Sequence, residues 1–335
     1  MSDAAREMPL DDERPDGLSR TLIGQSSVMR DLRERIVRLA PLELPVLIRG
    51  ESGVGKELVA QALHTLSGRS GHLVSFNVSE TPGSMFADAL FGHVRGAFTG
   101  ALTSRTGYFV EANHGTVFLD EIGTLQPESQ TVLLRAIEQK EFGPMGSSRN
   151  VKSDFRVVAA TNENLEQLVQ GGRFRSDLLY RLKGAVLRVP RLASRIEDIP
   201  ELARHFLRRE TRWHGAAHCT DSALYTLQQY QWPGNVRELQ QVLTCAAAFS
   251  RSPSLSDQEI GAALEANMEV TVPELSPTSV MPFRPTAERL LRMMRAAGGD
   301  TAEVARTLGV SRKTVYRWMG QLGIPTPQRR REGAP

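Results

Sequence analysis

Residues 50–56 read Gly50-Glu51-Ser52-Gly53-Val54-Gly55-Lys56 and give the clearest indication of architecture in this 335-residue chain. The apolar run at residues 46–48 precedes this stretch, and a helical pattern at residues 58–63 follows it. A strand, a glycine-rich loop and a helix in this order are typical of a P-loop, where backbone N–H groups bind phosphate oxygens. We therefore expect a nucleotide site with Lys56 at the β- and γ-phosphates. The alternative is a glycine-rich turn with a solvent-exposed lysine.

A second apolar run, residues 116–119, ends in the carboxylates Asp120 and Glu121. In open α/β sheets, ligands bind at the carboxyl ends of the strands. Asp120 is expected to hold Mg²⁺ through water, and Glu121 to orient and deprotonate an attacking water. Two carboxylates after a strand are also common as an exposed strand end, but their place about 65 residues after the P-loop lysine favours hydrolysis.

Two asparagines follow neighbouring apolar runs. Asn162 comes after residues 156–160 and could polarise the same water from an adjacent strand. Asn77 comes after residues 73–76 and is a candidate switch residue that contacts Glu121. Either asparagine taken alone could be an ordinary strand cap.

Short apolar runs alternate with amphipathic stretches from about residue 21 to residue 190. This pattern is typical of buried parallel strands with crossover helices, so we expect an α/β fold with a parallel sheet there. Residues 191–266 have a helical pattern, with Thr220 expected to cap one helix. The other expected segments are a disordered arm at 1–20, a linker at 267–285, an all-α unit at 286–324 and a basic tail at 325–335.

Composition excludes several classes of protein. Hydrophobic residues make up 40% and charged residues 24% of the chain, as in globular proteins, and no apolar run approaches the ~18–20 residues of a membrane span. Residues 1–20 contain six acidic side chains and no apolar core, so no secretory signal is visible. Cys219 and Cys245 match no close-spaced metal or redox motif. Two thiols without a signal indicate a reducing cytoplasm, and no membrane partner is expected.

The C-terminal end is basic. Residues 284–332 hold 11 Lys and Arg against 4 Asp and Glu, so this segment carries a net +7 in a chain whose total is +3. Such an asymmetry indicates either a nucleic-acid-binding unit or a solvated basic tail.

Two helices are expected within this basic end. Asp300 and Glu303 resemble a capping pair that opens a helix through Leu308, and Ser311 is expected to cap a second helix that ends near Leu322. The expected shared core is Ala305, Leu308, Val310, Val315, Trp318 and Leu322. The expected DNA-binding residues are Ser311, Arg312, Lys313, Thr314, Tyr316 and Arg317, because a helix in a major groove places its first residues on base edges and its basic groups on phosphates. An amphipathic protein-binding pair of helices is the alternative.

Residues 96–101 read Gly96-Ala97-Phe98-Thr99-Gly100-Ala101. Two glycines around an aromatic residue and a hydroxyl indicate a mobile loop that presents Phe98 to a partner. A tight turn with Phe98 packed inward is the alternative.

Together these stretches closely resemble the AAA+ domain of bacterial sigma-54-dependent transcriptional activators, the enhancer-binding proteins. The resemblance covers about residues 22–264 and continues into the C-terminal helices. The matching strings are residues 50–57, 90–93, 96–101, 115–123, 159–162 and 232–239. Glu57 stands where the general P-loop pattern has a Mg²⁺-binding Ser or Thr, but it is the usual residue of this family.

The resemblance implies an AAA+ core, a helical lid and a Fis-type helix-turn-helix. It implies ATP and Mg²⁺ as ligands, and a loop at 96–101 that touches sigma-54, with Thr99 central. Arg175 and Arg181 would reach the ATP of the next subunit, and Arg237 would sense the γ-phosphate. The implied partners are sigma-54 with its RNA polymerase holoenzyme, enhancer DNA and further copies of the chain in a ring, usually a hexamer.

Two tracts depart from the family pattern. Residues 77–80 read Asn-Val-Ser-Glu in place of the usual Asn-Cys-Ala-Ala, and residues 189–195 differ from the usual Pro-Pro-Leu-Arg-Glu-Arg tract. The leading hypothesis is an ATPase ring that drives the loop at 96–101 against sigma-54 to form the open promoter complex. The alternatives are a DNA-binding repressor or scaffold with a degenerate ATPase domain, and a chaperone-type AAA+ remodeller of another client.

Regulation is a further expectation. The matching core begins near Leu22, and about 20 residues are too few to build a receiver or ligand-binding domain. We therefore expect an activator that lacks an N-terminal regulatory domain and is competent by default. Its abundance or a separate regulatory protein would control it, and obligate assembly with a paralogous subunit is the main alternative.

Overall fold

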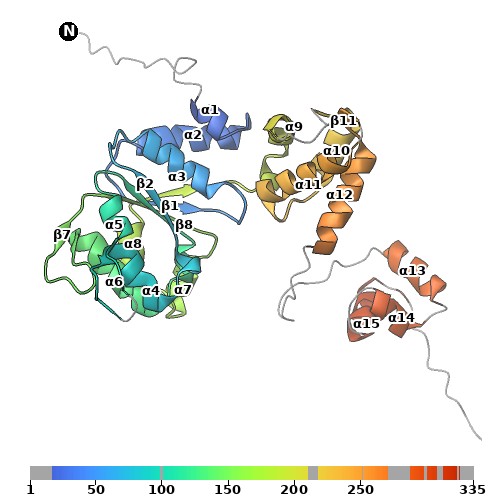
Figure 1. Cartoon of the computed structure of the whole chain (residues 1–335). Coiled ribbons are helices and arrows are strands. Elements are labelled where there is room, and N and C mark those ends of the chain that lie inside the picture. The colour runs from blue at the N-terminus through green and yellow to red at the C-terminus, as the bar shows by residue number, and fades with distance from the viewer. Residues whose placement is uncertain are drawn as a thin grey trace, which may run out of the picture. The chain divides into compact units, whose positions relative to one another are not determined.

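The computed structural model describes residues 17–98, 101–209, 218–250, 252–270, 287–297, 300–307, 312–322 and 324 (Figure 1). The chain divides into two compact units, Met1–Val270 and Thr271–Pro335. Within the first unit, a parallel sheet with helices on both faces forms a core, and a group of helices forms a lid.

The core sheet has five parallel strands in the order β2-β5-β8-β1-β9. Their bounds are β1 Val46–Arg49, β2 Leu73–Asn77, β5 Thr116–Asp120, β8 Arg156–Thr161 and β9 Ala185–Arg188. β8 is buried along its whole length, and β1 and β5 along all but their last residue. A strand covered on both faces needs a continuous apolar run, which is the pattern seen in the sequence. The predicted α/β fold with a parallel sheet is confirmed.

Helices cover both faces of this sheet (Figure 1). One face carries α1 (Gly17–Thr21), α2 (Ser27–Leu39) and α3 (Lys56–Thr65), and the other carries α4 (Gly83–Phe91), α5 (Tyr108–Glu111), α6 (Pro127–Gln139), α7 (Leu165–Gln170) and α8 (Ser176–Leu182). Successive side chains of β1 point to opposite faces: Val46 and Ile48 belong to the buried cluster that includes Ile36 of α2, whereas Leu47 belongs to the cluster that includes Leu133 of α6. Two apolar layers therefore hold the P-loop strand in place.

The N-terminal arm was predicted to be disordered up to residue 20, and this boundary is wrong. Gly17–Thr21 forms the short helix α1. Leu18 packs against the buried cluster below α2 and α3, and its carbonyl accepts the Leu22 N–H at 2.8 Å. The apolar contact of Leu18 explains the difference. The segment before it is dominated by acidic residues, so its composition predicts disorder although one leucine can still pack against the core. Residues 1–16 lie outside the described part of the chain.

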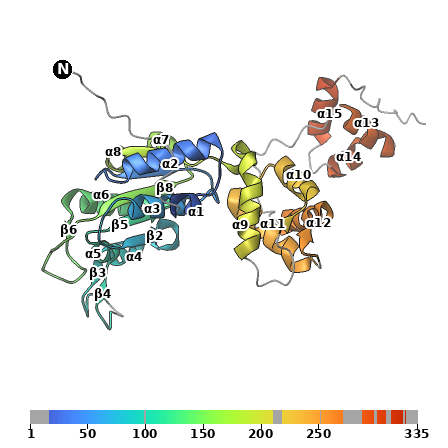
Figure 2. The ribbon, with the colours of Figure 1, turned by 90° about the horizontal axis from the view of Figure 1, so that it is seen from above.

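Two short antiparallel hairpins project from the core (Figure 2). β3 (Gly92–His93) pairs with β4 (Arg105–Thr106), and β6 (Glu141–Phe142) pairs with β7 (Val151–Lys152). The Val94 N–H donates to the Met145 carbonyl at 3.0 Å, and the Met145 N–H donates to the Gly92 carbonyl at 2.8 Å. These bonds join the bases of the two hairpins, so the loop at 96–101 begins from a fixed platform.

The lid is helical, as predicted, and forms a group beside the sheet layer (Figure 2). It contains the 3-10 turns Leu192–Ser194 and Ile196–Asp198 and the helices α9 (Ile199–Arg209), α10 (Asp221–Gln229), α11 (Asn235–Phe249) and α12 (Asp257–Val270), with a small parallel pair of β10 (His218–Cys219) and β11 (Ser254–Leu255). Thr220 caps α10 by accepting the Ala223 N–H at 3.2 Å, as predicted. α12 continues to Val270, so the helix extends four residues into the segment predicted as a linker.

The second unit contains three described helices, α13 (Ala287–Ala296), α14 (Thr301–Thr307) and α15 (Arg312–Gln321). Its core includes Leu290, Met294, Val304, Val315, Trp318 and Met319. Of the predicted core residues, Ala305, Val315 and Trp318 are buried and Leu322 is partly buried, while Leu308 and Val310 lie outside the described residues. α14 begins directly after Asp300, as predicted. Among the described residues of both units, no helix is long and apolar enough to cross a membrane.

Candidate active site

The P-loop joins β1 to α3, as its sequence predicts. Gly53 and Gly55 have φ angles of +76° and +100°, in the left-handed region that favours glycine. A Cβ atom at Gly53 would also collide with the Gly234 carbonyl of the lid. Gly55 precedes α3 without a side-chain cap, so this helix N-terminus faces the loop with its N–H groups available to an anion.

Lys56 is the first residue of α3 and is 7% exposed. Its Nζ donates to the carbonyls of Gly50 at 3.2 Å and Glu51 at 3.4 Å. The same ammonium lies 3.5 Å from Glu121 Oε1. The structure therefore brings the P-loop lysine and the second carboxylate of β5 together, although 65 residues separate them in sequence.

Asp120 ends β5 and Glu121 follows it in a left-handed conformation with φ of +54°. The Glu121 N–H donates to Asp120 Oδ1 at 2.9 Å. Burial raises the pKa of the Asp120 carboxyl group, and repulsion from Glu121 adds to this, while the Glu121 N–H and Lys56 act in the opposite direction. Asp120 is thus a partly desolvated carboxylate beside a second one, an arrangement that a cation would stabilise.

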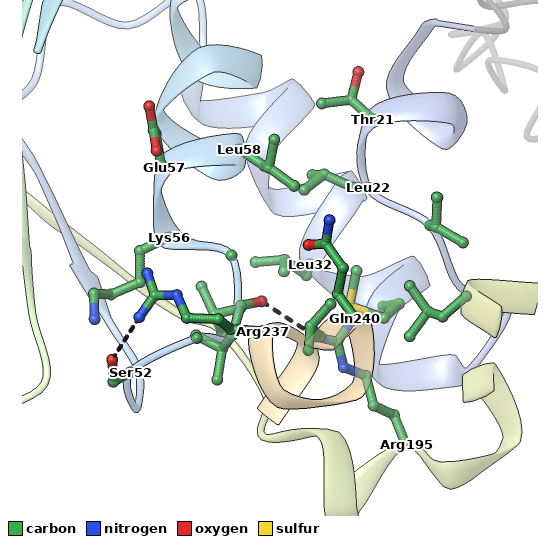
Figure 3. Close-up of a pocket in the computed structure, with 18 of the residues that line it drawn as sticks. Thr21, Leu22, Leu32, Ser52, Lys56, Glu57, Leu58, Arg195, Arg237 and Gln240 are labelled. Atoms are coloured by element: carbon green, nitrogen blue, oxygen red, sulfur yellow. Dashed lines mark hydrogen bonds between the residues drawn. The ribbon is translucent and has the colours of Figure 1, made fainter. Parts of the chain in front are cut away.

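A cavity of about 660 Å³ lies between the core and the lid (Figure 3). Lys56, Ser52 and Arg237 lie together at one end of it, and Leu22 and Arg195 lie away from them. Its core-side lining includes residues 52–58, Asn77, Asp120, Glu121, Leu22, Ile23 and Met29, and its lid-side lining includes Arg195, Leu202, His205, Phe206, Val236, Arg237 and Gln240. The end that holds Lys56 and Arg237 is therefore polar and contains the Glu121 carboxylate beside Lys56, and the rest of the lining includes Leu22, Ile23 and Phe206 together with Arg195.

The lid contacts the P-loop directly. Arg237 Nη1 donates to Ser52 Oγ at 3.1 Å. The N–H groups of Val236 and Arg237 both donate to the Gly53 carbonyl, at 3.1 and 3.2 Å. The family resemblance implies that Arg237 senses the γ-phosphate, and the structure places Arg237 beside Ser52 of the P-loop.

The two asparagines predicted near the carboxylates lie at strand ends. Asn77 ends β2 and is the Cα partner of Asp120 on the neighbouring strand β5. Its side-chain amide donates to Glu80 Oε1 at 2.7 Å, while Glu121 faces Lys56, so the predicted contact between Asn77 and Glu121 stays a prediction. Asn162 follows β8, the other neighbour of β5, and is exposed.

Arg175 and Arg181 lie at the two ends of α8, away from the cavity lining of their own subunit. Arg175 is exposed and pairs with Asp177 through Nη2 at 2.7 Å and Nε at 3.0 Å. The hydrogen bonds that Arg175 donates to Asp177 raise the pKa of the Arg175 guanidinium. Arg181 is exposed in the last turn of α8.

The glycine-flanked loop is described in part. The Gly96 N–H donates to the Ala101 carbonyl at 2.9 Å, and the Ala101 N–H donates to the Phe98 carbonyl at 3.0 Å. Phe98 is 43% exposed, and the edge of its ring contacts His93 with 5.0 Å between ring centroids. Ala97 is part of the same turn, whereas Thr99 and Gly100 lie outside the described residues.

The predicted DNA-contact residues belong to α15 or precede it. Arg312 is exposed at the start of α15. The Tyr316 hydroxyl accepts a hydrogen bond from Thr301 Oγ1 at 3.1 Å, which links α14 and α15. Lys313, Thr314 and Arg317 fall within the bounds of α15, and Ser311 lies outside the described residues.

Comparison with known protein families gives two matches. Residues 22–188 match the model of the sigma-54 interaction domain, and residues 193–276 match the model of an AAA+ ATPase lid domain. The chain belongs to the sigma-54-dependent transcriptional activators. Members of this family are AAA+ ATPases, so this activator is an ATP-hydrolysing enzyme.

Individual relatives agree with this assignment. The chain is 42% identical to the transcriptional regulatory protein ZraR of Klebsiella oxytoca over 298 residues, which cover 88% of this chain and 67% of that one. It is 37% identical to the DNA-binding transcriptional regulator NtrC of Rhizobium meliloti over 356 residues, with 95% and 72% covered. The crystal structure of NtrX from Brucella abortus in complex with ATP has a TM-score of 0.66 and 30% identity, and covers 90% of this chain and 69% of NtrX.

Sequence reasoning missed two buried residues of this activator's core–lid joint. Asn235 accepts the Leu192 N–H and donates to Glu51 Oε2 at 3.0 Å and to the Ser52 carbonyl at 3.1 Å. Arg195 donates through Nη1 to Met29 Sδ and through Nη2 to the Val54 carbonyl at 3.3 Å. Both lie in tracts that match or depart from the family pattern, but their partners are 43 to 184 residues away along the chain.

Proposed function

We propose that this activator binds ATP with Mg²⁺ in the cavity between core and lid and hydrolyses it with Glu121 as the general base. The observation that carries the proposal is the convergence of Lys56 and Glu121 within 3.5 Å at the polar end of that cavity. The amide groups of residues 50–55 and the α3 N-terminus would hold the phosphates, with Glu57 on the same first turn. The apolar end, with Leu22, Ile23 and Phe206, suits a purine base.

Asp120 is the residue that fits Mg²⁺. Its carboxyl group is partly buried beside a second carboxylate, and burial raises its pKa, so a divalent cation would compensate its negative charge. Mg²⁺ usually keeps several waters, so Asp120 would hold it through water. When bound, the ion neutralises charge on the transferred phosphoryl group.

The roles of the other polar residues follow from where they lie. Lys56 would move from the Gly50 and Glu51 carbonyls to the phosphates, and Arg237 would report the γ-phosphate to the lid. Asn162, at the end of the strand beside β5, would help to orient water. Arg175 and Arg181 are exposed and outside the cavity of their own subunit, which suits a role at the ATP of a neighbouring subunit.

We propose that copies of this chain assemble into a ring, a hexamer as in its family, in which composite ATP sites form between neighbouring copies. The loop at 96–101 would contact sigma-54, with Phe98 exposed on a turn that the two joined hairpins support. Hydrolysis would then drive the polymerase holoenzyme from the closed to the open promoter complex.

The basic second unit would bind enhancer DNA through α15 and the residues before it.

The test is Glu121→Gln in the purified full chain. Because the amide cannot accept the proton of water, we expect kcat to fall by at least about 100-fold, the low end of a general-base contribution. ATP binding should remain, because Lys56 and the loop amides are intact. Lys56→Ala is the matched control and should weaken ATP binding itself. Normal turnover by Glu121→Gln would rule out Glu121 as the base.

A further inference from the structure

We propose that Asp198 is a positioning residue, which joins the two walls of the cavity where the purine base would lie and so sets the base-dependent part of nucleotide affinity. The inference rests on the proposed function, because that function places the base at the end lined by Leu22, Ile23 and Phe206. Asp198 is 1% exposed and ends the 3-10 turn Ile196–Asp198 at the entry to the lid.

The first step concerns the hydrogen bonds of Asp198. Its Oδ1 accepts the Gln25 N–H at 2.7 Å and the Ser26 N–H at 2.8 Å, and its Oδ2 accepts the Ser26 hydroxyl at 2.7 Å. Hydrogen bonds to a carboxylate are shorter and stronger than those between neutral groups. Ser26 is the N-cap residue of α2. A carboxylate of the lid entry therefore fixes the point at which the chain enters the first long helix of the core.

The second step concerns the other anchor of this segment. Arg33 of α2 donates through Nη1 to the carbonyls of Leu22 at 2.9 Å and Gly24 at 2.6 Å. Gly24 has φ of +133°, and a Cβ atom there would lie 2.5 Å from Asp198 Oδ2. The approach of the carboxylate to the backbone thus requires a glycine. Residues 22–26 are held between a guanidinium group of the core and a carboxylate of the lid entry.

The third step concerns the two walls of the cavity. Leu22 and Ile23 line it on the core side, and Leu202 and Phe206 of α9 line it on the lid side. α9 begins at the residue directly after Asp198. The carboxylate therefore stands at the start of one wall and binds the segment that forms the other. Loss of its three hydrogen bonds would let the two walls separate.

The fourth step concerns the phosphate end, which has anchors of its own. The N–H groups of Val236 and Arg237 donate to the Gly53 carbonyl, and the Arg237 side chain donates to Ser52. Among the described residues, no hydrogen bond joins Asp198 to residues 50–56. A ligand that contacts the P-loop alone should therefore be insensitive to Asp198, whereas a ligand that fills both ends should depend on it.

The experiment measures binding of ADP and of inorganic pyrophosphate, which lacks the base, to the purified full chain by titration calorimetry. Asp198→Ala leaves the Gln25 and Ser26 N–H groups without their acceptor, and we expect Kd for ADP to rise about five- to tenfold while Kd for pyrophosphate stays within about twofold. Asp198→Asn should lose less, because its amide oxygen still accepts both N–H groups. Glu197→Ala, an exposed carboxylate of the same turn, is the matched control and should match the unmodified chain.

Gly24→Ala disturbs the same contact from the opposite side, because its Cβ atom collides with the Asp198 carboxylate. It should show the same selective loss of ADP binding. Circular dichroism verifies that each variant is folded, and Gly24→Ala decides the question if Asp198→Ala is not. Unchanged ADP binding in these variants, or an equal loss for ADP and pyrophosphate, would overturn the inference.

Lys56→Ala separates this inference from the proposed function, because the P-loop lysine serves both ligands. It should weaken binding of ADP and of pyrophosphate alike. Weak binding by Lys56→Ala beside unchanged binding by Asp198→Ala would reject the role of Asp198 alone. Unchanged binding of both ligands by Lys56→Ala would reject the proposed nucleotide site itself.

Discussion

Replacement of Asn235 by alanine should destabilise the first unit and loosen the lid from the P-loop. Asn235 is fully buried at the start of α11. Its Oδ1 accepts the Leu192 N–H at 2.8 Å, and its Nδ2 donates to Glu51 and to the Ser52 carbonyl. One side chain therefore connects the lid, the segment that enters the lid and the phosphate-binding loop.

The size of the effect follows from two costs. The Leu192 N–H is part of a buried hydrogen bond, and a buried donor left without its acceptor costs roughly 1–3 kcal/mol. Asn235 also has φ of +55°, a conformation that asparagine tolerates and that costs alanine about 1–2 kcal/mol. Together they predict a loss of about 3 kcal/mol in the free energy of unfolding. For a unit of this size each kcal/mol lowers Tm by roughly 2–4 °C, so Tm should fall by about 6–12 °C.

Thermal unfolding followed by circular dichroism measures this shift, and ATP titration of the same samples measures the effect on the P-loop. Asn150→Ala is the matched control, because Asn150 is exposed and its only described bond, to Glu141, is 3.5 Å long. The control should stay within about 0.5 kcal/mol of the unmodified chain. A Tm for Asn235→Ala equal to that of Asn150→Ala would show that the side chain does not join core and lid.

Three further expectations concern coupling, assembly and pH. Thr99→Ala should hydrolyse ATP yet fail to open a sigma-54 promoter in a purified transcription assay, and full open-complex yield would contradict a role for the loop. Arg175→Ala subunits mixed with Glu121→Gln subunits should recover some turnover, since a mixed ring holds intact composite sites; no recovery at any ratio, in rings verified by size, would argue against catalysis between subunits. Pairing with Lys183 and Arg49 lowers the pKa of Glu166 from 4.5 to about 2, so its stabilising effect is complete above about pH 4.5 and is lost as pH falls towards 2. Glu166→Gln should flatten the dependence of Tm on pH in that window, and an unchanged slope would be evidence against these ion pairs.

The parts of the site that could be predicted from sequence are those whose chemistry is local. The P-loop is a strand, a turn and a helix in consecutive residues, and its glycines are required by backbone angles at Gly53 and Gly55. Asp120 and Glu121 follow directly from the buried strand β5. In each case the side chain and the strand or helix that positions it lie in the same short stretch of sequence. The local sequence pattern is therefore sufficient to predict where that side chain lies.

The errors at the edges of the domains also have a local cause. Leu18 was assigned to a disordered arm because acidic residues dominate the segment around it. The short helix α1 is stabilised instead by packing of Leu18 against the buried cluster of α2 and α3. The residues of that cluster are distant in sequence, so the sequence around residue 18 does not reveal this contact. The end of α12 was predicted four residues early. A frayed helix end and a continuing helix have similar composition, so the sequence does not locate the last turn of a helix to within a few residues.

Hydrogen-bond partners are the part of the site that composition and spacing leave open. Asn77 was correctly placed at a strand end, and two carboxylates follow strands near it, Glu80 three residues after Asn77 and Glu121 directly after the neighbouring strand β5. The strand order β2-β5 brings Glu121 close, but the turn after β2 and the two bonds from Ser79 direct the amide to Glu80. A short stretch of sequence is thus enough to predict which side chains stand at a strand end, whereas their hydrogen-bond partners depend on how neighbouring segments pack. For this reason Asn235→Ala tests the structure more severely than any replacement within the P-loop, because the partners of Asn235 lie in the lid entry and in the P-loop.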